Sequence, residues 1–347
     1  MPSSQGKTRE TKRLASGWVA AVLAIALAGC GGGGSGSAPG PGPAPEPPPP
    51  PPPAAAQLHG RLWHNNYALD YREGTQIASP EGKLPVLATT NQDAHPWPDG
   101  TQFVTDNWNV YDDNSDLQVV DMASGQMLYS AKADGYLRNS RPSPVSKTMM
   151  MATIGKDSIS PADTIFIDLK TMSVVRRFSA DDPVNWLPDG RYLRVLSDGT
   201  LRIGDLAAGE VDAGRIDPPA AHSVQHLWVS PKGDQVAWRI QHNVSPTPEV
   251  DLWVSKLDGS NLERVTQTKM SHDAHWSPDG SKIAFDVDTG HFCNGVGCVG
   301  TCDLWWVPAT ARNVIAVPAS GDAWTFKVMD TRGSEQTLGC ALIAWTQ

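Results

Sequence analysis

The sequence predicts an all-β protein, a six-bladed β-propeller whose last blade is closed by strands from both termini. A short turn motif recurs along the chain, strand-like sequences follow each copy, and the two ends complement one another. The motif is complete in Trp97-Pro98-Asp99-Gly100, Trp186-Leu187-Pro188-Asp189-Gly190 and Trp276-Ser277-Pro278-Asp279-Gly280. Two degenerate copies surround Pro144 and Pro231. Aligned on their prolines, the copies recur every 43 to 47 residues.

Each motif predicts a tight turn between two strands. Proline sets φ for the second position of a type I turn, and glycine accepts the positive φ that follows. The next residues are apolar or alternate, as in segments 235–238 and 282–285. A third strand comes next, for example 117–121, and a short fourth strand leads to the next motif. Four strands per repeat is the pattern of a propeller.

The repeated tryptophans are expected to pack between neighbouring blades, because an indole ring buries a large apolar area. Stacking against a carbohydrate is the alternative that the sequence leaves open.

The blade count follows from the chain ends. The C-terminal part contains a degenerate hairpin, 324–329 with 341–345, and no further strand follows it. Segment 60–79 contains strand-like stretches at 62–64 and 68–70, before a turn at Gly74. Five complete repeats and one composite blade therefore make six, and closure of the ring removes an exposed sheet edge.

The repeats resemble those of the TolB-type β-propeller family, which carry this Trp-Ser-Pro-Asp-Gly turn before a strand such as Lys-Ile-Ala-Phe. The resemblance runs from about residue 59 to the C-terminus, although the Pro-Asp-Gly sequence is intact in only three copies. It implies the fold and not an activity, since the matching residues are structural. The family includes periplasmic partner-binding proteins, propeller halves of serine peptidases and a few enzymes.

Residues 1–29 are expected to be a lipoprotein signal peptide. Basic residues precede the apolar stretch 18–28, which is short for a transmembrane helix. Leu27-Ala28-Gly29-Cys30 resembles the bacterial lipobox, which implies that Cys30 carries the lipid. An ordinary signal peptide is the alternative. Gly31 stands where an inner-membrane retention signal usually has Asp, which favours the outer membrane, with the propeller in the periplasm or at the cell surface.

Residues 30–56 form a Gly/Pro-rich tether, and the propeller domain is expected to span 57–347. The formal net charge is −9 at pH 7. An acidic domain is a poor candidate for nucleic-acid binding.

Four cysteines remain after Cys30, and an even number in an oxidising compartment favours disulfides over metal. They are Cys293, Cys298, Cys302 and Cys340, and three pairings are possible. The segment 295–300 has G-x-G-x-x-G spacing but lacks the strand and helix of a dinucleotide site, and we expect no cofactor.

One group of polar residues remains as a candidate site. Two equivalent repeat positions carry imidazoles and carboxylates: Asp93, His95, His272, Asp273 and His275. The resemblance implies that these strands run nearest the central axis, so the side chains would face one another at the channel mouth. They either bond strand ends and loops or bind a metal and perform acid–base chemistry.

We therefore expect a lipid-anchored, non-enzymatic propeller that binds an envelope protein or a glycan. The alternative is a metal-dependent hydrolase or lyase that uses the histidines at the channel mouth.

Overall fold

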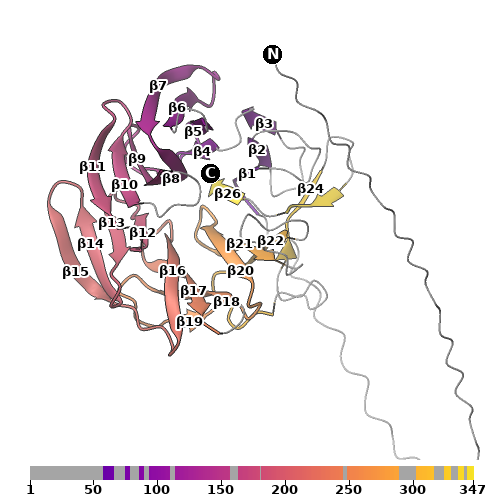
Figure 1. The fold of residues 1–347 in the computed structure, drawn as a ribbon. Coiled ribbons are helices and arrows are strands. Elements are labelled where there is room, and N and C mark those ends of the chain that lie inside the picture. Colours follow the sequence, from indigo (N-terminus) through magenta and orange to yellow (C-terminus); the bar gives the residue numbers. More distant parts are fainter. Residues whose placement is uncertain are drawn as a thin grey trace, which may run out of the picture. The chain divides into compact units, whose positions relative to one another are not determined.

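In the computed structural model, the four-stranded sheets surround a central axis (Figure 1). The structure describes residues 58–65, 75–78, 86–89, 94–109, 114–156, 163–179, 181–244, 248–288, 302–315, 324–329, 335–339 and 342–347.

Five four-stranded antiparallel sheets are built from consecutive strands. The first three contain β4 (Ala94–Pro96), β5 (Gln102–Asn109), β6 (Asn114–Asp121) and β7 (Met127–Asp134); β8 (Tyr136–Pro142), β9 (Met149–Gly155), β10 (Asp163–Asp168) and β11 (Ser173–Phe178); and β12 (Val184–Trp186), β13 (Tyr192–Val195), β14 (Thr200–Asp205) and β15 (Gly209–Arg215). The other two contain β16 (His222–Val229), β17 (Gln235–His242), β18 (Glu249–Lys256) and β19 (Glu263–Arg264); and β20 (Ser271–Trp276), β21 (Lys282–Asp288), β22 (Cys302–Pro308) and β23 (Trp324–Thr325). Together with the axial arrangement, these repeated sheets confirm the all-β propeller class.

A sixth four-stranded sheet joins the two ends of the described chain, in the order β26-β1-β2-β3. Its strands are β1 (Arg61–Asn65), β2 (Thr75–Ala78), β3 (Val86–Thr89) and β26 (Leu342–Thr346). We call it the closing sheet. A two-stranded hairpin of β24 (Lys327–Met329) and β25 (Glu335–Thr337) stands apart from the six.

The composition of the closing sheet differs from the sequence-based expectation. We expected the hairpin 324–345 to supply two of its strands, but only β26 belongs to it. Strand β23 instead pairs with β22, where Trp306 lies opposite Trp324. The sheet that contains β22 thus takes its fourth strand, β23, from the C-terminal segment. The closing sheet takes β3 as its fourth strand instead.

The turn prediction is confirmed. The amide of Gly100 donates to the carbonyl of Trp97 at 2.8 Å, and Gly280 donates to Ser277 at 2.8 Å. Both glycines have positive φ, 66° and 72°. The carboxylate of Asp279 accepts a bond from the amide of Ser281 at 2.9 Å, which explains the aspartate of the motif.

The predicted packing of the tryptophans is also confirmed. Trp276 is 6% exposed and shares a core cluster with Trp228 and Ala237 of the preceding sheet. Its Nε1–H donates to the carbonyl of Trp228 at 2.9 Å. Trp186 likewise packs against Phe166 of the preceding sheet, with ring centroids 4.6 Å apart. The tryptophans therefore join neighbouring sheets through both apolar contact and hydrogen bonds.

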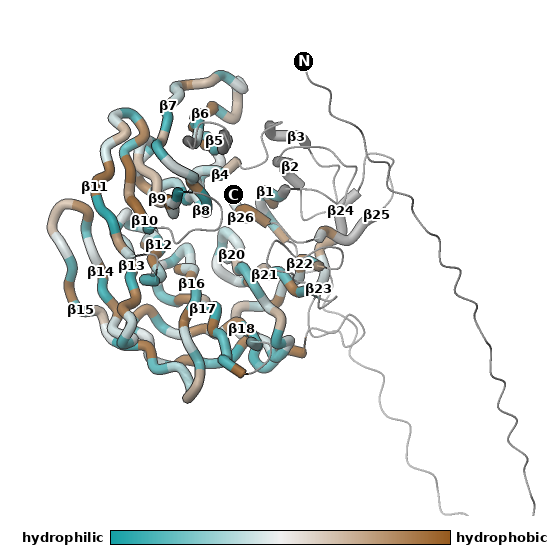
Figure 2. Tube along the Cα trace, viewed as in Figure 1, coloured by the Kyte–Doolittle hydropathy of each residue, from teal (hydrophilic) through white to brown (hydrophobic). Residues whose placement is uncertain are grey.

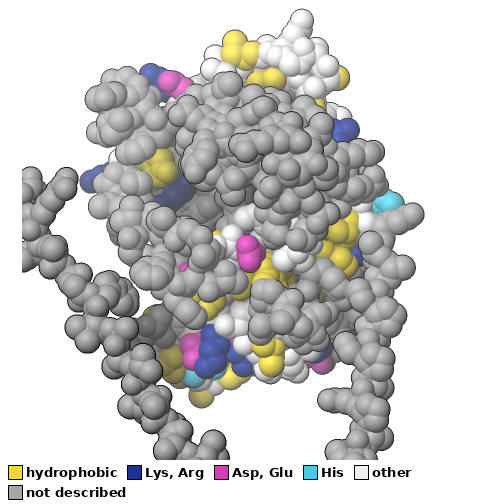
Figure 3. Space-filling view, turned by 90° about the vertical axis from the view of Figure 1, so that its right-hand side faces the viewer, with side chains coloured by type: hydrophobic (Ala, Val, Ile, Leu, Met, Phe, Trp, Pro, Cys, Tyr) yellow, Lys and Arg dark blue, Asp and Glu magenta, His cyan; other side chains and the backbone are white. Residues whose placement is uncertain are grey.

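Hydrophobicity decreases from the middle strands to the outer strands. Figure 2 shows β10 as largely hydrophobic and β11 as more hydrophilic, in line with their burial. On the face seen in Figure 3, hydrophobic, basic and acidic side chains are interspersed among the described residues.

Several predictions fall outside the described residues. These are the signal peptide, Cys30, the tether, Asp93, and Cys293, Cys298 and Cys340. Cys302 begins β22 and is disulfide-bonded, and the predicted pairings stay predictions. Within the described ranges, the structure has no helix with the length and apolarity to span a membrane.

Candidate functional site

Six edge strands surround the centre of the structure, one from each four-stranded sheet. We call β4, β8, β12, β16, β20 and β26 the axial strands. Contacts link β4 with β8, β12 with β16, β16 with β20, β20 with β26, and β26 with β4. Between β8 and β12, the Nε1–H of Trp186 donates to the carbonyl of Arg141 at 2.8 Å.

A cavity of about 460 Å³ opens among the ends of these strands. We call it the Trp–Pro cavity, because the turn motifs supply most of its wall. Its tryptophan and proline lining comprises Pro96, Pro98, Pro142, Pro144, Trp186, Pro188, Trp228, Pro231, Trp276 and Trp345. The tryptophans are only 6–7% exposed, so little of each ring is accessible from the cavity.

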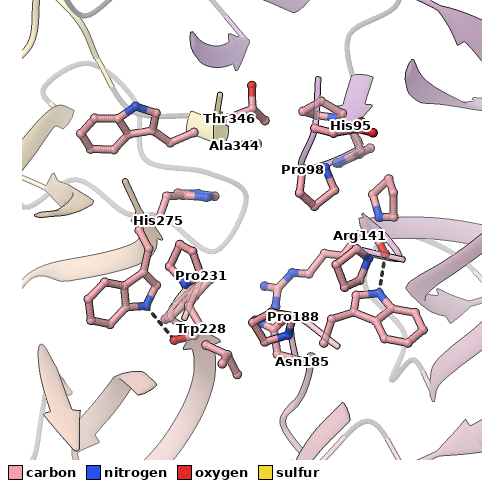
Figure 4. Close-up of a pocket in the computed structure, with 18 of the residues that line it drawn as sticks. His95, Pro98, Arg141, Asn185, Pro188, Trp228, Pro231, His275, Ala344 and Thr346 are labelled. Carbon is pink, nitrogen blue, oxygen red and sulfur yellow. Dashed lines mark hydrogen bonds between the residues drawn. The ribbon is translucent and has the colours of Figure 1, made fainter. Parts of the chain in front are cut away.

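The repeat places one side chain per strand at equivalent points of this cavity. The next-to-last residues of five successive axial strands all line it: His95, Arg141, Asn185, Trp228 and His275. Figure 4 shows these five, which we call the ring residues, around the open centre. The repeat therefore fixes the positions, while the residue type at each position decides the chemistry.

Bulges in three axial strands adjust the direction of their side chains. The register shifts between Arg138 and Arg141 in β8, between Val224 and His226 in β16, and between Ser271 and Ala274 in β20. In β8 the shift contains Asn139, whose φ is 54°.

A second cavity of about 300 Å³ adjoins the first and contains most of the ionisable groups. We call it the histidine cavity. It shares His95, Arg141 and His275 with the Trp–Pro cavity and adds Asp106, Arg138 and Asp273.

A small polar network fixes one side of the histidine cavity. The Nε2 atom of His95 lies 3.5 Å from Oδ2 of Asp106. The hydroxyl of Ser140 donates to the same oxygen at 2.7 Å. The carboxylate of Asp106 thus contacts side chains from both β4 and β8.

Asp273 is the centre of the opposite charge cluster. Burial alone would raise its pKa, but His226, Arg239, His275 and Arg141 together lower it. Its carboxylate lies 3.8 Å from Nη1 of Arg239. The side chain of Asp273 is 54% exposed and lines the histidine cavity. Its exposed surface therefore faces this cavity, and the charged groups named above surround the carboxylate.

The histidines beside Asp273 are held neutral. Burial lowers the pKa of His226 to about 4, against the opposing effect of Asp273. Burial also lowers the pKa of His275, and Arg141 acts in the same direction. Neutral imidazoles can accept hydrogen bonds at neutral pH.

The structure brings together three of the five predicted site residues. His95, Asp273 and His275 line the histidine cavity. His272 does not line either cavity. Its Nε2 is buried and has no hydrogen-bond partner among the described residues, and burial, followed by the charge of Arg239, lowers its pKa. His272 and Asp273 both lie within the bulge of β20, between Ser271 and Ala274. Asp93 lies outside the described residues.

No group of three or more His, Cys, Asp or Glu side chains among the described residues is arranged to hold a metal ion. Since Asp93 is not among them, this finding concerns only His95, His272, Asp273 and His275 of the predicted set.

Sequence reasoning did not select Arg141 or Asn185. Arg141 belongs to a degenerate copy of the turn motif, and Asn185 precedes the tryptophan of a complete copy. The available signal was their position, because each lies two residues before the loop that ends its axial strand.

No family model and no curated protein matches this chain. Solved structures with similar folds include a putative TolB from Agrobacterium tumefaciens, 15% identical with a TM-score of 0.45, over 83% of this chain and 93% of that one. An oligogalacturonate lyase in complex with manganese is 12% identical with a TM-score of 0.45, over 72% and 73%.

The hydrazine synthase of Kuenenia stuttgartiensis is 13% identical, with a TM-score of 0.42, and 62% of this chain is covered. This chain spans only 61% of that chain's length. At these identities and scores, the three likenesses carry no argument about activity.

Proposed function

We propose that this chain is a lipid-anchored binding propeller of the bacterial outer membrane that holds an envelope protein or a glycan at the Trp–Pro cavity. The observation that carries the proposal is the cavity itself. All six axial strands contribute to a concave, largely apolar wall with a few convergent polar groups. Such composition is typical of ligand sites.

The resemblance of the turn motifs to TolB-type repeats supports a binding role, since that family includes periplasmic partner-binding proteins. For closure, we propose that the six sheets are the six blades of one ring. The pairing of β1 with β26 and the chain of contacts among the axial strands support this arrangement.

The alternative function, a metal-dependent hydrolase or lyase, rests on His95, Asp273 and His275 at one cavity. Elemental analysis after purification without chelator or nickel separates the two functions. Stoichiometric zinc or manganese would favour the enzyme over the binding module.

Photo-crosslinking tests the binding site directly. Gln347 is exposed and lines the Trp–Pro cavity, whereas Val211 is 64% exposed on the outer strand β15. A benzophenone amino acid at position 347 should give a discrete adduct in cells, and the same residue at position 211 should not. Equal adducts at both positions, or none at 347, would contradict the cavity as the partner site.

The lipid anchor is tested at Cys30. Replacement of Cys30 by Ser should remove the only thiol that the lipobox resemblance assigns to lipid, so the protein should leave the membrane fraction or remain unprocessed. Intact-mass measurement of the wild-type N-terminus is the readout. A wild-type N-terminus without acyl mass would show that the ordinary signal peptide is the better explanation.

A further inference from the structure

Arg141 occupies the centre of the proposed binding site. It is the ring residue of β8 and lines both cavities. Figure 4 shows its side chain extending from β8 toward the middle of the Trp–Pro cavity, between Asn185 and Trp228. The bulge before it, with Asn139 in the left-handed region, gives the strand this local direction.

The guanidinium has more donors than its described surroundings use. A guanidinium carries five N–H groups. Within the described residues, the hydrogen bond that the Arg141 guanidinium donates runs from Nη1 to the carbonyl of Leu227 and is long, at 3.5 Å. The group also lies 5.9 Å from the centroid of the Trp228 ring. Burial lowers the pKa of Arg141, and the charge of Asp273 partly offsets this effect. The guanidinium nevertheless stays protonated.

Among the described residues around the axis, Arg141 shares the negative charge of Asp273 with Arg239, whose Nη1 lies 3.8 Å from the carboxylate. The nearby His226 and His275 are uncharged at neutral pH, because their pKa values are lowered. A partly buried cation without a full set of acceptors is costly, and a bound anion would offset that cost.

The surroundings favour a monoanion with an apolar body. A carboxylate matches the fork of a guanidinium with two parallel hydrogen bonds. A dianion such as phosphate would be repelled more strongly by Asp273, which interacts with Arg141 through its charge. The prolines and tryptophans that line the cavity suit apolar side chains, and the small accessible area of the tryptophan rings offers little for stacking a sugar.

We propose that Arg141 binds the C-terminal carboxylate of a partner polypeptide whose last side chains fill the Trp–Pro cavity. This inference rests on the proposed binding function and names the chemistry of its ligand. Asn185 assists from the next strand: one of its amide hydrogens is donated to Leu227 at 2.8 Å, which leaves the other for the ligand.

Calorimetry with a pair of small peptides tests the proposal. The probes are N-acetyl-leucyl-phenylalanine with a free carboxylate and the same dipeptide as its C-terminal amide. The acid should bind wild-type protein about tenfold more tightly than the amide, because only the acid accepts charged hydrogen bonds. Glucuronate serves as a third probe, which presents a carboxylate on a sugar.

Three variants assign the preference to Arg141. R141Q should weaken binding of the acid by about tenfold and leave binding of the amide unchanged. R141K should fall between, since lysine keeps the charge but loses the paired geometry. R177Q makes the same change at an exposed position on β11, where Arg177 pairs with Asp163, and should bind both probes as the wild type does.

Equal wild-type affinity for acid and amide would overturn the carboxylate proposal while leaving the cavity as a binding site. Binding of neither probe would overturn it as well, and the crosslink at position 347 would then judge the proposed function separately. Tighter binding of glucuronate than of the peptide acid would overturn the polypeptide assignment. If R141Q fails to fold by circular dichroism, R141K and the wild-type comparison decide.

Discussion

Replacement of Trp63 by alanine is expected to lower the free energy of unfolding by about 3–5 kcal/mol. Trp63 is fully buried in β1. Its Nε1–H donates to Oγ1 of Thr346 in β26 at 3.1 Å, and its ring lies 5.7 Å from that of Phe103 in the neighbouring sheet. The side chain of Trp63 thus links β1 to β26 within the closing sheet, and it also links the closing sheet to the neighbouring sheet.

Urea denaturation of purified protein is the measurement. Leu128→Ala is the control, because Leu128 is 46% exposed on the outer strand β7 and should change stability by no more than about 0.5 kcal/mol.

A chain that begins at Gln57 should unfold like the mature protein, whereas one that begins at Pro85 loses β1 and β2 and should be much less stable. Equal stability of these two chains would refute closure of the ring by both ends.

Acidification is expected to destabilise the protein through His64, the neighbour of Trp63 in β1. His64 is 1% exposed, and neither ring nitrogen has a hydrogen-bond partner among the described residues. Burial lowers its pKa to about 4. Between pH 6.5 and 4 the unfolded chain therefore binds more protons than the folded chain, so stability falls as the pH falls.

The expected loss from His64 between pH 8 and pH 5 is about 2 kcal/mol. His64→Leu and His64→Gln should both show a pH dependence that is smaller by this amount, although their stabilities at pH 8 should differ. Comparing urea unfolding at the two pH values separates loss of titration from altered packing. If both variants keep the wild-type pH dependence, His64 is not a source of acid sensitivity.

Local features of the fold were predictable because local chemistry produces them. Proline and glycine determine the turns at Pro98, Pro188 and Pro278, and the period of these turns sets the repeat. The packing of Trp186 and Trp276 was predictable for a similar reason, since a large apolar ring in every repeat has to be buried at a repeated interface.

The candidate site was predictable only in part. His95 and His275, which the repeat register places at equivalent positions, both line the Trp–Pro cavity. The register also placed His272 there, but His272 lies within the bulge of β20 and lines neither cavity, because the course of a bulge depends on the partner strand. Arg141 and Asn185 were missed because neither residue type repeats along the chain.

The sequence by itself determined the propeller class, the turns and the tryptophan interfaces, since each depends on residues close together in the chain or on a regular period. Only the tertiary structure decided which strands make the closing sheet. Strand β23 has two residues, too few for its sequence to select a partner, and its place beside β22 depends on which edge is free. The charge of the channel was likewise a tertiary result, because Arg141, Arg239 and Asp273 come from three different sheets and meet only at the axis.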